Sequence, residues 1–172
     1  LSHEGNGVFS AKHIFFTPSG EFKVVVDGHY YGSDTWNKAT VTDGSLTYLR
    51  PVADGADLKV ASPGFRSVAV APSSAGDGTL SLWVSAPESV LVEGVCMMEF
   101  DEASGSYRNT TGSLSWLPAS TPFDFKVDGD VMASPSTGAA GWYVPSVTVG
   151  DGGVSYNLAY REAAIEGESA GR

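Results

Sequence analysis

The sequence is poor in the residue types that catalytic and metal centres use most. Its 172 residues include one cysteine and three histidines, and ten basic residues stand against twenty acidic ones. One cysteine cannot form an intrachain disulfide, and no Cys-x-x-Cys or His-x-x-x-His spacing supports a zinc site. A formal net charge of −10 repels phosphate backbones and anionic lipids, so we expect no nucleic-acid partner. Neutral ligands, sugars included, carry no such penalty.

Long apolar runs are also missing. No stretch approaches the roughly 20 apolar residues that a membrane-spanning helix needs, so we expect no membrane insertion. The chain starts at Leu1 without an initiator methionine or a signal peptide, which indicates a processed or trimmed chain. Cys96 stands beside two methionines and between Glu93 and Glu99, without the basic neighbour that activates a thiol. We therefore expect it to pack in the core.

What the sequence does contain is the pattern of short strands and many turns. Apolar and polar residues alternate, as in Phe22, Val24 and Val26, which is typical of half-buried strands. Further strands are expected near Ser45–Leu49, Phe65–Ala71, Thr79–Ser85, Val90–Val95, Phe123–Val127, Val144–Val149 and Val154–Tyr160. Turn signals separate them at Asp27-Gly28, Asp43-Gly44, Asp54-Gly55, Pro63-Gly64, Asp77-Gly78, Asp128-Gly129 and Asp151-Gly152. The pattern predicts an all-β protein, an antiparallel β-sandwich with immunoglobulin-like units.

The chain also contains an internal similarity. Phe22-Lys23-Val24 leads to Asp27-Gly28, and Phe125-Lys126-Val127 leads to Asp128-Gly129. Such self-similarity predicts two related β units, 1–87 and 88–172, the second with a flexible C-terminal tail. One sandwich built from both halves is the alternative. The best helix-forming stretch, Ala159 to Glu168, runs into that Gly-rich tail.

No group of residues is arranged for catalysis. Gly167-Glu168-Ser169-Ala170-Gly171 matches the hydrolase nucleophile elbow, but no acid or histidine follows it. The Asp-Gly aspartates are expected to stabilise turns, and the spacings Asp54 to Asp57 and Asp128 to Asp130 are not those of a calcium loop. His13 and His29 are expected to have structural or plain loop roles. We therefore expect no enzyme, no metal and no cofactor.

Aromatic residues in loops are the better candidates for function. The first group is Tyr30, Tyr31 and Trp36, with Asn37 and Lys38 beside them; the second is Trp142 and Tyr143. An exposed ring can stack on the apolar face of a pyranose while nearby polar groups bind the hydroxyls. Two further tryptophans, Trp83 and Trp116, lie within strand patterns, and we expect them to pack in the core.

The motif Pro-x-Gly-x-Phe-Lys-Val at Pro18–Val24 resembles the tandem modules of SusE/SusF-type outer-membrane lipoproteins of Bacteroidetes. Ala53–Val60 followed by Pro63–Val70 is similar to the second half of such a module, Thr79–Trp83 to its closing strand, and Val90–Gly94 to the next opening strand. The resemblance covers residues 7 to 130. It implies a glycan-binding protein at the bacterial surface, with Trp36, Asn37 and Lys38 in the matching site. The first module lacks its opening strand, and the second lacks a closing strand and an expected tryptophan, so the resemblance assigns the second no ligand.

The sequence therefore predicts non-catalytic polysaccharide binding at a bacterial cell surface, through loop aromatics. The alternative is a structural or adhesive surface protein, of the pilus or scaffold type, that contacts a neighbouring surface protein. Pairing of a partner strand with an exposed sheet edge would support the alternative.

Overall fold

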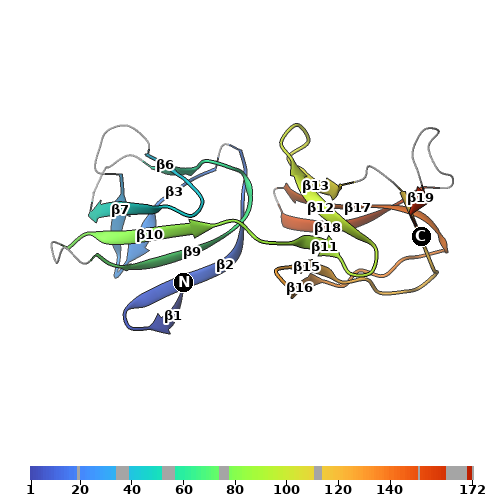
Figure 1. The fold of residues 1–172 in the computed structure, drawn as a ribbon, viewed down its shortest axis with the longest axis horizontal. Helices are drawn as coiled ribbons and strands as arrows, with labels where there is room; N and C mark the ends of the chain where they lie inside the picture. The colour runs from blue at the N-terminus through green and yellow to red at the C-terminus, as the bar shows by residue number, and fades with distance from the viewer. Residues whose placement is uncertain are drawn as a thin grey trace. The chain divides into compact units, whose positions relative to one another are not determined.

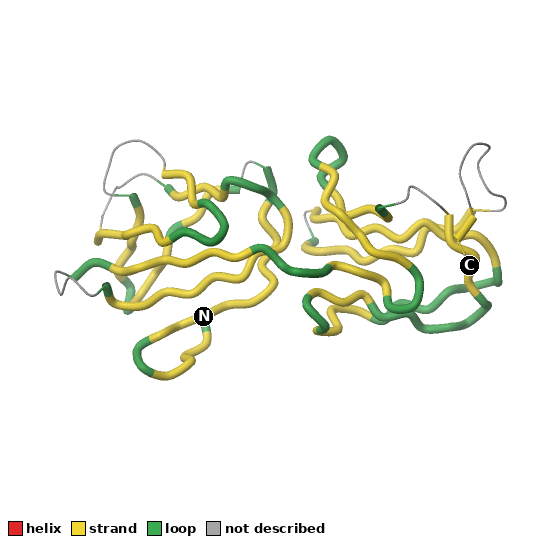
Figure 2. The backbone as a smooth tube through the Cα atoms, in the orientation of Figure 1, coloured by secondary structure: helices red, strands yellow, loops and turns green. Residues whose placement is uncertain are grey.

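The computed structural model is built from strands and turns, with no helix among the residues that it describes (Figures 1 and 2). These residues are 1–18, 20–33, 39–51, 57–73, 78–110, 114–150, 152–161 and 170–171. The predicted all-β class with antiparallel sheets is confirmed, and the arrangement is consistent with a β-sandwich. No stretch within the described ranges forms a helix that is long and apolar enough to cross a bilayer.

The chain divides into two compact units, Leu1–Ala86 and Pro87–Arg172, and each sheet takes its strands from one unit. The sequence predicts this division one residue later, after residue 87. The strands of the first unit are β1 (Ser2–Gly5), β2 (Val8–Phe16), β3 (Glu21–Phe22), β4 (Val24–Val26), β5 (His29–Gly32), β6 (Ala39–Val41), β7 (Leu46–Pro51), β8 (Leu58–Val60), β9 (Gly64–Pro72) and β10 (Leu80–Ser85).

The first unit has a seven-stranded sheet in the order β1-β2-β9-β10-β7-β5-β4 and a three-stranded sheet in the order β3-β8-β6. Strand alternation explains its core, because Leu82 and Val84 of β10 are buried while Trp83 between them is exposed. The core residues are Phe16, Val24, Val41, Leu49, Leu58, Val60, Val68, Val70, Leu82 and Val84. Strand β2 carries a bulge where His13 takes a positive φ of 57°, so His13 has the structural position expected of it.

The strands of the second unit are β11 (Val90–Val92), β12 (Cys96–Asp101), β13 (Ser106–Asn109), β14 (Leu114–Leu117), β15 (Phe125–Val127), β16 (Asp130–Ala133), β17 (Gly141–Gly150), β18 (Gly153–Arg161) and β19 (Ala170–Gly171). They follow the order β16-β15-β11-β12-β13-β17-β14-β19, with β18 paired to the free side of β17. Phe125 of β15 is almost fully buried, and its ring meets Tyr156 of β18 edge-on at 5.5 Å.

The strand expected at Val154–Tyr160 lies within β18, and the stretch with the best helix-forming composition, Ala159 to Glu168, begins inside this strand. Strand β18 continues to Arg161 because Ala159 and Tyr160 are paired with Val144 and Tyr143 of β17. The predicted tail is also partly ordered, since Ala170 and Gly171 pair in parallel with Leu114 and Ser115. Residues 162–169, including Ser169, lie outside the described part.

Candidate functional site

Strand β17 of the second unit has one buried face and one accessible face. Its residues alternate between buried and half-buried from Gly141 to Thr148, because a strand directs successive side chains to opposite faces. Tyr143, Pro145 and Val147 belong to the buried set, and Trp142 and Val144 to the half-buried set. The accessible face is therefore the one that carries Trp142.

Three residues stand in register across this accessible face. Trp116 of β14 is directly opposite Trp142 of β17, and Trp142 is directly opposite Arg161 of β18. Side chains at directly opposed positions of an antiparallel pair lie on the same face, with Cβ atoms roughly 5 Å apart. Trp116 is 40% exposed, and Arg161 is exposed at the other end of the row. We call Trp116, Trp142 and Arg161 the tryptophan row.

The buried face beneath the tryptophan row holds it in place. The Tyr143 hydroxyl donates a hydrogen bond of 2.6 Å to the Ala139 carbonyl, and the Tyr143 ring meets Tyr160 at 5.4 Å. Gly141 leaves room for this arrangement, since a Cβ on Gly141 would lie 2.5 Å from the Tyr160 ring. Rings that stand on a packed strand are pre-organised, which lowers the entropy cost of binding a ligand.

Polar side chains extend the same face. Ser146 of β17, two positions after Val144, is opposite both Asn157 of β18 and Arg108 of β13. The Asn157 amide and the Arg108 guanidinium therefore lie in one row, where both can donate hydrogen bonds to the hydroxyl groups of a ligand. Asn157 and Arg108 are exposed. Flat rings with amide and guanidinium groups beside them can bind a neutral polyhydroxylated ligand, by stacking and by hydrogen bonds.

The structure separates the aromatic residues that the sequence had grouped together. Tyr30 and Tyr31 lie in strand β5 and not in a loop, so they point to opposite faces. Tyr30 is 53% exposed, whereas Tyr31 is half-buried and packs against the core of the first unit. Trp36, Asn37 and Lys38 lie outside the described residues.

The predicted second group is also divided. Trp142 and Tyr143 begin strand β17 and do not belong to a loop; Trp142 lies on the accessible face, while Tyr143 is buried with its hydroxyl bonded. The prediction that Trp83 and Trp116 pack in the core is wrong, because they are 41% and 40% exposed. Each stands between buried neighbours in its strand, so strict alternation was the signal that would have placed both rings outside.

The first unit has an exposed aromatic patch of its own. Trp83 of β10 is opposite Leu46 of β7, and Tyr48 stands two positions along β7, opposite Ser81. Tyr48 is 61% exposed, and the neighbouring strand β9 carries small Ala69 opposite Trp83. Among the described residues, those paired directly with Leu46, Tyr48 and Trp83 are uncharged, while Arg50 stands two positions beyond Tyr48 on the same face of β7.

A few titratable groups are perturbed by burial or held by a bonded partner. Burial raises the pKa of the Cys96 thiol to about 11, which keeps it protonated and unreactive at neutral pH. Asp43, which was expected to support a turn, forms an ion pair with the buried Arg66, at 2.8 Å between Arg66 Nε and Asp43 Oδ1. A hydrogen bond from Ser104 lowers the pKa of Asp101, and a 2.8 Å bond to Glu93 raises that of Lys126. Within the described ranges, no three His, Cys, Asp or Glu side chains gather as metal ligands would.

Comparison with known proteins adds no relative, because no family model, curated protein or solved structure matches the chain.

Proposed function

We propose that this protein binds carbohydrate without cleaving it, at a bacterial cell surface, through the tryptophan row of its second unit. The observation that carries the proposal is the register of Trp116, Trp142 and Arg161 on one accessible sheet face. A sheet face is nearly flat, so it can present both indole rings to successive sugar residues. The ligand class is a neutral polysaccharide, because a net charge of −10 disfavours anionic polymers.

The resemblance to SusE/SusF-type modules supports the same function and adds its location. It implies an outer-membrane lipoprotein on the extracellular side, built from immunoglobulin-like units. The glycan site that it implies, Trp36, Asn37 and Lys38, stays a prediction of the sequence. In this proposal the tryptophan row is a second site, in the unit to which the resemblance assigned no ligand.

Affinity electrophoresis in gels that contain soluble polysaccharides tests the proposal. The wild-type chain should be retarded by at least one neutral glycan. Trp116→Ala should weaken binding by about 2 kcal/mol, or roughly thirtyfold, because it removes one of the two stacking rings. Trp83→Ala is the matched control, since it removes an equally exposed tryptophan from a strand of the first unit.

Three results would contradict the proposal. Unretarded migration on a broad panel of neutral glycans would exclude carbohydrate binding. Equal loss of retardation in Trp83→Ala and Trp116→Ala would show that the tryptophan row is not the site. Release of reducing ends from a retained glycan would replace binding with catalysis.

The alternative, a structural or adhesive surface protein, is favoured by the patch of Leu46, Tyr48 and Trp83. Exposed apolar patches on a sheet face are typical of protein contacts, and the described residues directly opposite Trp83 and Tyr48 are uncharged. Sedimentation velocity over a range of concentrations separates the two functions. Self-association that Tyr48→Ser abolishes, with no retardation by glycans, would favour the structural role.

A further inference from the structure

The hairpin of β17 and β18 continues the accessible face beyond the tryptophan row. Its strands are paired from Trp142 to Gly150 without a bulge, so every second pair stands on this face. The pairs that follow the tryptophan row have uncharged side chains. They are Val144 with Ala159, Ser146 with Asn157, and Thr148 with Ser155. We call these three pairs the hairpin face; from Trp142 to Thr148 it extends over about 20 Å, at roughly 3.3 Å per residue.

The chemistry of the hairpin face changes along its length. Val144 and Ala159, next to the tryptophan row, form a low apolar step. The amide of Asn157 and three hydroxyl groups lie beyond this step. On β18 these positions are exposed, and on β17 they are half-buried. An amide and hydroxyl groups supply hydrogen-bond donors and acceptors together, which a sugar hydroxyl requires because it is itself both.

The polar side chains of the hairpin face are not used by the protein itself. Within the described part of the chain, the side chains of Asn157 and of its three hydroxyl neighbours make no hydrogen bond. Other hydroxyl groups of the second unit do: Ser104 donates to Asp101 at 2.7 Å, and Thr137 donates to the carbonyl of Pro118. The hydrogen-bonding capacity of the hairpin face is therefore available to a ligand.

The border of the hairpin face has no excess of positive charge. Arg108 of β13 stands opposite Ser146, and Glu99 of β12 stands opposite Arg108. The Nε atom of Arg108 also lies 3.6 Å from Oδ2 of Asp101. One guanidinium thus stands between two carboxylates, so an anionic ligand would gain little here. A neutral ligand brings no charge that must be desolvated.

The opposite face of the hairpin is packed, which fixes the hairpin face in position. Val147 of β17 is fully buried. The Tyr156 ring of β18 meets Phe125 of β15 edge-on at 5.5 Å. A ligand therefore meets side chains on a rigid support, and less conformational entropy is lost on binding.

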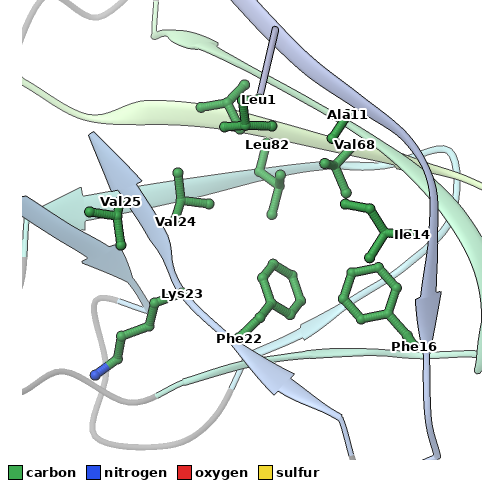
Figure 3. A pocket seen from close by; sticks show the side chains of 11 residues that line it. Leu1, Ala11, Ile14, Phe16, Phe22, Lys23, Val24, Val25, Val68 and Leu82 are labelled. Carbon is green, nitrogen blue, oxygen red and sulfur yellow. The ribbon is translucent and has the colours of Figure 1, made fainter. Parts of the chain in front are cut away.

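A cavity in the first unit has the opposite chemistry and does not suit a sugar (Figure 3). It has a volume of about 370 Å³, and its walls are apolar side chains such as Phe16, Phe22 and Leu82. Lys23 is the one residue with a polar side chain among the described residues that line it, and its ammonium group points away, 3.4 Å from Asp57. Sugar hydroxyl groups in this cavity would lose their bonds to water without replacement.

We infer that the glycan site extends from the tryptophan row along the hairpin face, so that its ligand is an uncharged sugar chain of tetrasaccharide length or longer. This inference rests on the proposed function. Sugar units at one end stack on Trp116 and Trp142. The units that follow lie over Val144 and Ala159, and their hydroxyl groups exchange hydrogen bonds with Asn157. A disaccharide on the indole rings is too short to reach Asn157, which lies about 13 Å farther along the hairpin.

Neither a protein nor a nucleic acid fits the hairpin face as well as a sugar chain does. Protein contacts have an apolar core, and Val144 and Ala159 are the apolar side chains that this face offers. Nucleic acids bind through basic residues at the phosphates, and none of the three pairs contains one.

A length series of oligosaccharides tests the inference. The soluble neutral polysaccharide that retards the chain in affinity gels is partially hydrolysed, and its fragments, from disaccharide to octasaccharide, compete with the intact polymer. We expect competition to strengthen at least tenfold between disaccharide and pentasaccharide, which corresponds to one or two hydrogen bonds, and then to level off.

Asn157→Ala locates the additional contacts on the hairpin face. It should weaken competition by the hexasaccharide roughly fivefold to tenfold, the loss of about one hydrogen bond, and leave competition by the disaccharide unchanged. Ser155→Ala should weaken competition by the hexasaccharide to a smaller extent. Ser81→Ala is its matched control, because it removes a serine from strand β10 of the first unit and should change neither value.

The outcomes separate this inference from the proposed function. Equal competition by disaccharide and hexasaccharide, or wild-type competition by the hexasaccharide in Asn157→Ala, would overturn the inference alone, provided that Trp116→Ala still weakens retardation. Absence of retardation by every neutral glycan would overturn both.

Discussion

Replacing the two turn aspartates, Asp27 and Asp128, by alanine should destabilise the two units unequally. Alanine at a φ of 49° costs about 1 kcal/mol at either turn, because a Cβ crowds the backbone in the left-handed region. Asp128→Ala also removes two charge-assisted hydrogen bonds, from Glu88 N and Ser89 N. These bonds are at the surface, so we assign them together about 2 kcal/mol. No side-chain hydrogen bond of Asp27 exists among the described residues.

Hydrogen–deuterium exchange with peptide-level resolution measures the two units separately, which a single unfolding curve of a two-unit chain does not. In Asp128→Ala, exchange in β11 and β15 should rise by roughly a hundredfold, which corresponds to about 3 kcal/mol. In Asp27→Ala, exchange in β4 and β5 should rise by only about fivefold. Asp128→Asn is the control, because asparagine tolerates the turn and keeps an acceptor oxygen. Equal effects of Asp27→Ala and Asp128→Ala would refute the role given to the Asp128 carboxylate.

Three further predictions concern the second unit. Phe125→Ala should lower its free energy of unfolding by about 3–5 kcal/mol by emptying a buried ring site, whereas the exposed Val131→Ala should change it by less than about 0.5 kcal/mol; hydrogen–deuterium exchange in β11 and β15 compares them. Cys96, with its pKa raised to about 11 from 9.0, should react with a thiol reagent at pH 8 about a hundredfold more slowly than in urea; equal rates would contradict its burial. Because the folded thiol holds its proton more tightly, the stability that it contributes is present below pH 9 and is lost as the pH rises to about 11. Gly141→Ala should displace the Tyr160 ring and lower the free energy of thermal unfolding by about 1–2 kcal/mol. In a chain that also carries Tyr160→Ala, where the ring is gone, the same substitution should cost much less; equal costs with and without Tyr160→Ala would contradict the contact.

The local structure was predictable because it depends on neighbours in sequence. The Asp-Gly pairs at 27–28 and 128–129 form the expected turns, and Val144–Val149 lies within β17 as alternation required. Trp83 and Trp116 were predicted to be buried because tryptophan is apolar. Their positions in the alternating pattern of the strand, between two buried residues, indicated the exposed face instead. Their buried neighbours occupy the core face, so the large rings are left on the accessible face.

The candidate site was only partly predictable. Trp142 was found, but its partners Trp116 and Arg161 come from strands that lie 26 and 19 positions away in sequence and meet only through sheet pairing. The pairing of β4 with β5 follows from the Asp27-Gly28 turn, but a local sequence pattern carries no information about which distant strands pair with each other.

Strand β12 has a consequence for how the second unit opens. Its first two residues, Cys96 and Met97, pair with β11, and the remainder, from Met98 to Asp101, pairs with β13. One continuous strand thus carries hydrogen bonds on both sides at different points along its length, so fraying that starts at β11 reaches β13 within a few residues. We therefore expect a pulling force applied at Pro87 to produce one rupture event, in place of a stepwise peeling of strands.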